Sequence, residues 1–434
     1  MFIIFSTLIL LFYIRWDLVI LFISINFINC FIRINGRQIL FFDKNTCRSI
    51  LVLLSVLIIL FIAINRNMLN QFSNKKILYM INIVITLIIL SLCFYSSNFF
   101  LFYFLFELVI IPTFFIVLRW GYRTERIQAG AYLFIYTLLA SLPFLIFLIN
   151  FWKNKISLIF DLNFFYQNTQ HYYSYWWIII SGVFIVKIPV YLVHIWLPKA
   201  HVEAPVSGSI ILAGILLKLG RYGFLKSFSI SLISFIKNEA ILISISGIGT
   251  LIIRLYCLRQ NDLKCLVAYS SVAHINLIMI SILSLSWIRI KRAIIMIVAH
   301  GLSSSAIFFI LNIFYLANKS RRIIIIKSLL LRSPILSFWW FTLCCLNISC
   351  PPSINFVSEI FILISVIAWT KILKIILFTI LIVRGVYSII IFTLANHGEK
   401  NVTYKINLNS CNDTLILRSH VFLSFSLTLI IFLI

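Results

Sequence analysis

Long apolar runs separated by short polar connections are the feature that most constrains this chain. Each run is apolar on all sides and does not alternate, so it predicts a membrane-spanning helix rather than a barrel strand. We therefore expect an all-α polytopic membrane protein with about fourteen helices, each needing about 20 residues to span. The expected spans are 1–14, 17–32, 50–65, 77–95, 97–118, 127–150, 174–197, 205–228, 239–257, 264–286, 292–316, 335–369, 373–396 and 417–434.

Composition excludes a soluble protein. Hydrophobic residues make up 62% of the 434 residues and charged residues only 11%, against about 45–50% and about 25% in globular domains. The longest connections, 151–173 and 397–416, are too short for a soluble domain. A single membrane domain over 1–434 is expected.

The net charge of +25 does not indicate nucleic acid, because the basic residues are scattered at the ends of apolar runs. Such positions are typical of side chains that anchor helix ends at lipid headgroups. The residues interpreted in this way are Arg33, Arg37, Lys75, Lys76, Arg123, Arg126, Arg289, Lys291, Arg292, Arg321 and Arg322.

The sequence predicts no metal or cofactor on this chain. Its nine cysteines follow no CxxC or Cys/His spacing, and Cys344, Cys345 and Cys350 are interpreted as small buried hydrophobes. There is no GxGxxG or P-loop pattern for a nucleotide.

The stretch from Tyr175 to Gly223 holds two apolar runs, each with a lysine near its middle. Lys187 and Lys218 would therefore lie near the bilayer midplane, where insertion of a lysine costs about 2.5 to 3.5 kcal/mol. Pro189 removes a helix hydrogen bond two residues after Lys187. A costly buried lysine beside a broken helix indicates a functional site.

Lys187, His194 and His201 follow one another at seven-residue intervals, close to two helical turns. Wherever the helix persists, they share one face about 10 Å apart, so that water would have to bridge them. This pattern indicates a hydrated proton path. Alternatively, the two histidines could bond carbonyls freed near Pro189 and Pro198.

A second interrupted helix is expected in 335–369, where Pro351 and Pro352 stand together and Glu359 follows. Interrupted segments at corresponding places in two halves are typical of inverted-repeat transporters. We therefore expect repeats at about 77–228 and about 239–396. N-terminal helices would occupy 1–95, overlapping the first repeat, and a C-terminal helix 417–434.

One buried ionisable group is expected well inside each of six helices: Glu107, Lys187, Lys218, His274, His300 and Glu359. Groups at similar depth on different helices favour a proton path that runs laterally through the membrane. Each has a structural alternative. Glu107 could be a static ion-pair partner, His300 could bond nearby hydroxyls, and His274 could bond Ser270 or Ser271.

Burial favours the neutral form of an amine, whereas a nearby carboxylate favours its ammonium form. A Glu107–Lys187 pair would thus hold a proton that separation of the pair releases. Arg384 lies in mid-helix, where a permanent charge needs a partner, and we expect it to pair with Glu359.

The segments LFELVIIPTFFIVLRWGYRTERIQAG, VKIPVYLVHIWLPKAHVEAPVSGSIILAGILLKLGRYG, DLKCLVAYSSVAHINL and AHGLSSSAIFF closely resemble the subunit 4 family of mitochondrial NADH:ubiquinone oxidoreductase, an antiporter-like family of respiratory complex I. The resemblance covers about residues 96–397. It implies that Glu107 and Lys187 are paired, that Lys218 continues the proton path, and that Glu359 connects it to the exit. The acid at position 359 favours subunit 4, because sister subunits usually carry lysine there.

The resemblance implies a multi-pass, organelle-encoded protein of the mitochondrial inner membrane. It would be a subunit of an H+-translocating NADH:ubiquinone reductase, beside two sister antiporter-like subunits and other membrane subunits. NADH, FMN, iron–sulfur clusters and ubiquinone would bind partner subunits, with no redox chemistry on this chain. The alternatives are a stand-alone cation/proton antiporter, or a structural membrane spacer in which the buried charges are dispensable.

Overall fold

The computed structural model describes residue 24 and residues 44–65, 76–153, 159–160, 176–283, 287–318, 320–369, 373–398 and 411–432. The helices predicted at 1–14 and 17–32, and most of both long connections, lie outside these residues. Regular structure in the described part is helical, with two isolated β-bridges, and nine of its helices are long and apolar enough to cross a membrane. The predicted all-α membrane fold is confirmed, and the count of about fourteen helices stays a prediction.

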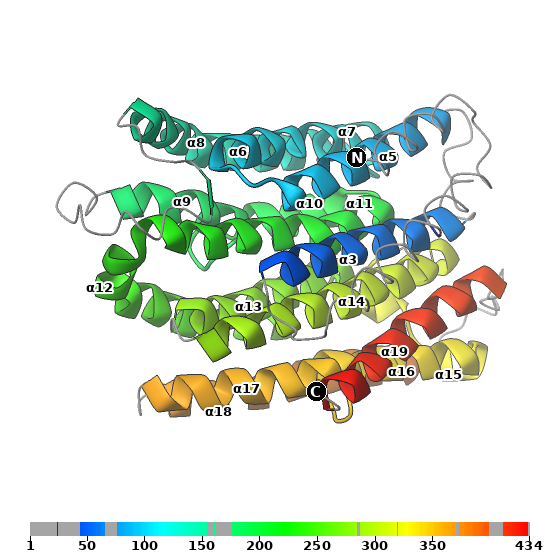
Figure 1. The fold of residues 1–434 in the computed structure, drawn as a ribbon. Helices are drawn as coiled ribbons and strands as arrows, with labels where there is room; N and C mark the ends of the chain where they lie inside the picture. The colour runs from blue at the N-terminus through cyan, green and yellow to red at the C-terminus, as the bar shows by residue number, and fades with distance from the viewer. Residues whose placement is uncertain are drawn as a thin grey trace. The chain divides into compact units, whose positions relative to one another are not determined.

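Figure 1 shows the course of the chain. Its helices are α3 (Lys44–Ile64), α5 (Lys76–Tyr95), α6 (Phe99–Leu108), α7 (Ile110–Trp120), α8 (Arg126–Lys153), α9 (Trp176–Lys187), α10 (Trp196–Glu203), α11 (Val206–Ile211), the π-helix η3 (Leu212–Leu216), α12 (Leu217–Leu258), α13 (Leu263–Leu283), α14 (Trp287–Asn318), the 3₁₀ turn η4 (Ile323–Ile325), α15 (Leu329–Arg332), α16 (Pro334–Ile348), α17 (Ile354–Trp369), α18 (Leu373–Asn396) and α19 (Cys411–Phe432).

Two predicted boundaries are wrong. The connection expected at 229–238 is helical, because this segment contains neither Gly nor Pro and α12 continues through it. The helix expected at 97–118 is interrupted at Val109. The breaks predicted after Lys187 and at 350–353 are confirmed, since α9 ends at Lys187 and α17 begins only at Ile354.

The chain forms two compact units. Unit 1 comprises 1–189 and 203–238, and unit 2 comprises 190–202 and 239–434. The inverted relation between the predicted repeats stays a prediction.

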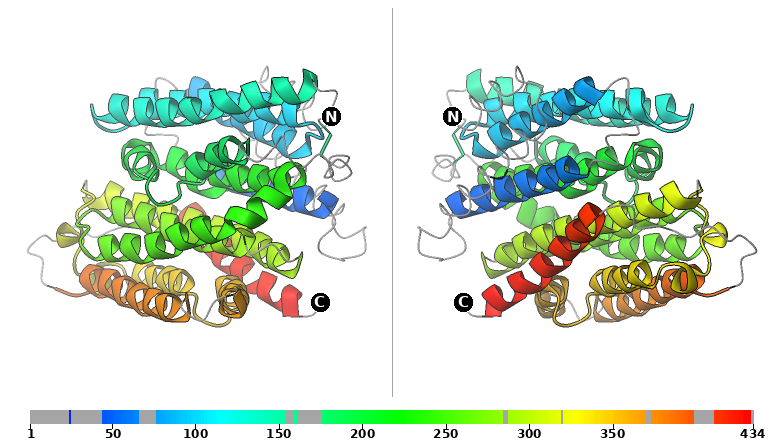
Figure 2. Two further views of the ribbon diagram at one scale, coloured as in Figure 1. Left: turned by 90° about the vertical axis from the view of Figure 1, so that its left-hand side faces the viewer. Right: turned by 90° about the vertical axis from the view of Figure 1, so that its right-hand side faces the viewer.

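Within unit 1, α5 packs against α3, α6 and α7, while α8 packs against α7 and α9. Helices α5 to α8 lie side by side in one layer (Figures 1 and 2). Phe184 of α9 is surrounded by aromatic rings, with centroids 6.0 Å from Phe106, 5.7 Å from Phe144 and 6.3 Å from Phe224. This aromatic packing holds the last turn of α9, which ends with Lys187, in place.

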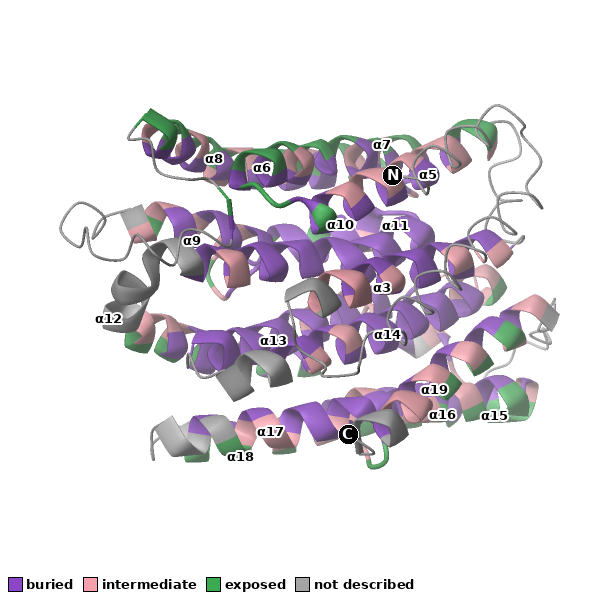
Figure 3. Ribbon diagram, viewed as in Figure 1, coloured by how far each residue is buried: buried purple, intermediate pink, exposed green. Residues whose placement is uncertain are grey.

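Within unit 2, α14 packs against α13, α16, α17 and α19, and α18 packs against α16 and α17. Figure 3 shows α13 buried along its length, and 94% of that span is buried against 33% of the α8 and α18 spans. The burial of α13 places it in the core of unit 2, whereas the exposed apolar faces of α8 and α18 suit lipid or other membrane subunits.

Candidate functional site

Glu107 and Lys187 form a buried ion pair in unit 1, as predicted. Lys187 Nζ lies 3.0 Å from Glu107 Oε1, and the two side chains are 3% and 17% exposed. The ammonium group also donates to the carbonyl of Phe106 at 3.2 Å and lies 3.1 Å from the centroid of the Phe106 ring. Lys187 therefore has three stabilising contacts on one helix.

Breaks in both helices position this pair. Pro112 has no N–H for the carbonyl of Leu108, where α6 ends, so Glu107 lies in the last turn of α6. Pro189 likewise stands two residues after Lys187, which is the last residue of α9. Only the second break was predicted from the sequence, although Pro112 gives the same signal.

Lys218 is fully buried on α12, directly after the π-helix η3. Its Nζ donates to the carbonyl of Ala213 in η3, and no carboxylate pairs with it among the residues that the structure describes. A Cβ on Gly220 would lie 3.3 Å from Lys187 Cβ, so α12 packs closely against the end of α9. The structure thus brings together the parts of the chain that carry both lysines.

The shared face predicted for Lys187, His194 and His201 is wrong. The helix ends at Lys187 because of Pro189, and Leu192, with φ of 88°, adopts a left-handed conformation before α10 begins. His194 therefore lies in an irregular segment and only His201 lies on α10.

Both of these histidines contact aromatic rings in unit 2. The His194 ring stacks on Tyr191 at 5.5 Å and meets Tyr269 edge-on at 6.2 Å. His201 stacks on Phe308 at 5.0 Å with an interplanar angle of 7°. These contacts suit a packing role, and a proton-carrying role for either histidine stays a prediction.

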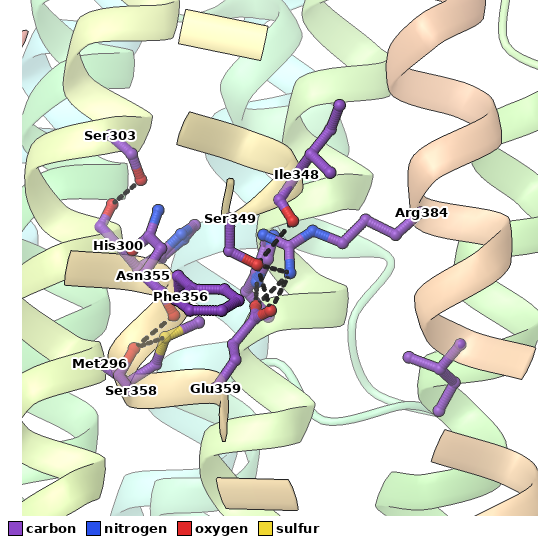
Figure 4. Close-up of polar contacts among 12 residues, drawn as sticks. Met296, His300, Ser303, Ile348, Ser349, Asn355, Phe356, Ser358, Glu359 and Arg384 are labelled. Atoms are coloured by element: carbon purple, nitrogen blue, oxygen red, sulfur yellow. Dashed lines mark hydrogen bonds and ion pairs between the residues drawn. The ribbon is translucent and has the colours of Figure 1, made fainter. Parts of the chain in front are cut away.

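Glu359 and Arg384 form the second buried ion pair, also as predicted. Arg384 Nη1 donates to both carboxylate oxygens, and the hydroxyl of Ser349 donates to Oε2 (Figure 4). Ser349 lies in the break between α16 and α17, so the break itself supplies a ligand to the pair.

His274 lies beside Glu359, and His300 lies beside His274. His274 Nδ1 is 3.4 Å from Glu359 Oε1, and the rings of His274 and His300 are 5.2 Å apart. The hydroxyls of Ser270 and Ser271 donate to carbonyls of their own helix. The neighbour of His274 is therefore Glu359, rather than the serines considered in the alternative.

The residues that the structure describes contain no group of three or more His, Cys, Asp or Glu side chains able to hold a metal ion. Cys344 is buried, whereas Cys345 and Cys350 are partly exposed. The absence of cofactors from this chain stays a prediction.

Comparison with known proteins identifies the family. A model of the membrane region of the NADH:quinone oxidoreductase/Mrp antiporter family matches residues 96–384. The chain belongs to this family. Its relatives include NADH-ubiquinone oxidoreductase chain 4 of Ceratitis capitata, 42% identical over 349 residues that cover 80% of this chain and 78% of the relative. The chain 4 of Myxine glutinosa is 36% identical over 406 residues, which cover 93% of this chain and 88% of the relative.

Solved structures show that the antiporter-family fold is shared. A chain of respiratory complex I from Thermus thermophilus superposes with a TM-score of 0.86 at 17% identity, covering 98% of this chain and 93% of that one. A chain of the Mrp complex from Dietzia gives 0.83 at 13% identity, covering 98% and 92%.

Three buried basic residues of this antiporter-family chain, two arginines and one histidine, were not predicted from the sequence. Arg221 and Arg254, both on α12, are fully buried, and Arg254 donates to the carbonyl of Ile380. His420 on α19 lies 3.1 Å from the hydroxyl of Ser305. Arg254 interrupts an apolar run just as Arg384 does, so the same argument would have found it.

The prediction that Arg321 anchors a helix end at the headgroups is wrong. This residue is only 9% exposed, and its guanidinium donates to the carbonyl of Val202 at 2.7 Å. Lys264 donates to the same carbonyl at 3.3 Å. Val202 lies in the last turn of α10, where the free carbonyls carry partial negative charge and attract both basic side chains.

Replacing Gly249 with Ala should destabilise the antiporter-family fold around His194. A Cβ at this position would lie 2.2 Å from Cβ of Tyr191, on which His194 stacks. The resulting overpacking costs about 1 to 3 kcal/mol, so thermal unfolding in detergent should occur at a lower temperature. Gly385→Ala is the matched control, because nothing lies within 4 Å of its added Cβ. Equal unfolding temperatures for both variants would contradict this close approach.

Proposed function

We propose that this chain is a proton-translocating membrane subunit of an H+-translocating NADH:ubiquinone reductase. The observation that carries the proposal is the Glu107–Lys187 ion pair, held at 3.0 Å between helix ends inside apolar spans. A buried pair of this kind is expensive and contributes little net stability, which favours a functional reason for its presence. The relatives named NADH-ubiquinone oxidoreductase chain 4 support the assignment to that complex.

In the proposed mechanism the pair stores a proton. While Glu107 contacts Lys187, the carboxylate stabilises the ammonium form in a buried site. A movement that separates the two groups leaves the Lys187 ammonium buried without its carboxylate partner. Burial without a counter-charge favours loss of the proton. Both groups stand at helix ends, where the backbone can move with the least loss of internal hydrogen bonds.

Lys218 is the proposed next carrier, since α12 packs closely against the end of α9. Its ammonium group has a carbonyl partner in η3 and no acid among the described residues, so little holds the proton once it arrives. Water is the proposed bridge between the lysines. In unit 2, the proposed groups are His274, His300 and Glu359, which lie beside one another.

The proposed setting is the mitochondrial inner membrane, with the chain multi-pass and organelle-encoded. Other membrane subunits, including two sister antiporter-like subunits, and lipid are the proposed partners. NADH, FMN, iron–sulfur clusters and ubiquinone would bind elsewhere in the complex, so that this chain carries protons and no electrons.

A stand-alone cation/proton antiporter is the second candidate, because the matched family model also covers Mrp antiporters and a chain of the Mrp complex shares the fold. The shared fold comes with only 13% identity, whereas the two chain 4 relatives described above are 42% and 36% identical. The first proposal therefore has the stronger support.

Assembly distinguishes these two candidates. After mild solubilisation of membranes, the chain should migrate only with a large complex that oxidises NADH with ubiquinone. Reconstituted alone into liposomes, it should show no cation/proton exchange with a pH-sensitive dye. Exchange by the isolated chain that Lys187→Met abolishes would instead establish the stand-alone antiporter.

A further inference from the structure

Arg384 engages the whole carboxylate of Glu359. Its Nη1 donates to both oxygens, and it also donates to the Ser349 hydroxyl at 3.0 Å. That hydroxyl donates in turn to Glu359 Oε2. Arg384 is 1% exposed and Glu359 is 5% exposed, so water does not compete for these bonds (Figure 4).

The Glu107–Lys187 and Glu359–Arg384 pairs differ in the cation. Lys187 can lose its proton, because burial readily favours a neutral amine. A guanidinium stays charged in proteins, so Arg384 cannot give up its proton to Glu359. Protonating Glu359 would leave a buried guanidinium facing a neutral acid, which is the arrangement that buried pairs avoid.

A second guanidinium lies nearby. Arg254 of α12 is fully buried and donates to the carbonyl of Ile380, one turn before Arg384 on α18. Its Nε and Nη2 have no hydrogen-bond partner among the described residues. The hydroxyl of Tyr387 is likewise buried and without a partner there. Two permanent positive charges therefore act near one carboxylate, and both favour its ionised form.

Two histidines extend this cluster. His274 of α13 is 3.4 Å from Oε1 of Glu359, and His300 of α14 is next to it, with ring centroids 5.2 Å apart. An imidazole has two ring nitrogens, so it can accept a proton on one side and release it on the other. These are the neighbouring groups suited to carry a proton past a carboxylate that keeps its charge.

We infer that Arg384 is a positioning residue that fixes Glu359 as a permanent carboxylate, so that His274 and His300 carry the proton in unit 2. This inference rests on the proposed function and refines it. It replaces the carrier role that the resemblance implies for Glu359 with an electrostatic one, in which the fixed carboxylate offsets the repulsion between the Arg384 guanidinium and a protonated His274.

Infrared titration of the assembled complex tests the state of Glu359. The C=O stretch of a protonated carboxylic acid, isolated by subtracting the Glu359→Gln spectrum, is followed from about pH 5 to about pH 9, where a buried acid without ionic partners titrates. Wild-type protein should show no such band from Glu359, and Arg384→Gln should reveal one. A Glu359 band in the wild type, or none in Arg384→Gln, would overturn the inference.

In the same experiment, Arg384→Lys tests whether the positive charge at position 384 or the planar shape of the guanidinium keeps Glu359 ionised. It keeps a cation beside Glu359, so the carboxyl band should stay absent. If Arg384→Gln fails to assemble, the wild-type titration and the pumping of the charge-free double variant described next decide together.

Pumping by the assembled enzyme gives an independent readout. Glu359→Gln should lower NADH-driven pumping roughly tenfold, since it leaves the Arg384 guanidinium buried without a partner. Adding Arg384→Gln removes the unpaired charge and should restore at least about half of the wild-type pumping. His274→Gln should abolish pumping in either background. A double variant as inactive as Glu359→Gln, with assembly intact, would show that Glu359 itself carries the proton.

These outcomes separate the inference from the proposed function. The infrared bands report the protonation of Glu359 whether or not the chain moves protons. Normal pumping in Lys187→Met would contradict the proposed function and leave the infrared result standing.

Discussion

Replacing Lys187 with Met should lower NADH-driven proton pumping by about a hundredfold or more, the scale expected when a positioned proton carrier is removed. The variant keeps a side chain of similar length and removes the ammonium group that contacts Glu107 at 3.0 Å. Proton movement is measured with a pH-sensitive dye in sealed vesicles that contain the assembled enzyme, while NADH oxidation is followed in parallel. In a tightly coupled enzyme, NADH oxidation should fall together with pumping.

Lys153→Met is the matched control for this variant. Lys153 is exposed at the end of α8, so its charge is solvated and its loss should leave pumping unchanged. Normal pumping and assembly in Lys187→Met would mean that the buried ammonium only holds α9 against α6.

Replacing Lys218 with Met should also lower pumping, by roughly tenfold or more. Lys218 is fully buried and donates to the carbonyl of Ala213 in η3, so methionine removes the proposed proton carrier from a buried position. The methionine fits the same apolar surroundings, and assembly should therefore persist. The comparison is made in the same vesicles with the same dye.

Lys226→Met supplies the control on the same helix. Lys226 lies about two turns after Lys218, is only partly buried, and has its ammonium 5.2 Å from the ring centroid of Phe160. Pumping should be unchanged there. Equal losses in both variants would assign the effect to helix α12 rather than to a carrier at Lys218.

The cost of charge in a membrane made both ion pairs predictable from the sequence. Lys187 and Arg384 each stand in an apolar run, where a partner is obligatory, and few acids lie deep enough to serve. The structure confirms Glu107 and Glu359 as these partners. Prolines predicted the broken helices for an equally local reason, because a missing N–H acts on the carbonyl four residues before it.

Some irregular backbone and some contacts between distant segments were not predicted. The π-helix η3 has no proline, and the contact of Lys218 with the Ala213 carbonyl, five residues earlier in the same helical stretch, accompanies this local irregularity. Leu192 adopts a left-handed conformation that moves His194 off the helix. A glycine would have indicated such a conformation in the sequence, but this position is a leucine. Arg321 was assigned to lipid headgroups because nothing local shows that it reaches the carbonyl of Val202.

The most direct test of the proton switch is the double variant Glu107→Gln with Lys187→Met, assayed for NADH-driven pumping beside each single variant. The double variant removes both charges and so leaves no unpaired ion in the core. If the pair stores a proton, pumping by the double variant should stay as low as in Lys187→Met. Recovery of wild-type pumping would contradict the switch and show that Glu107 and Lys187 only hold the helices together.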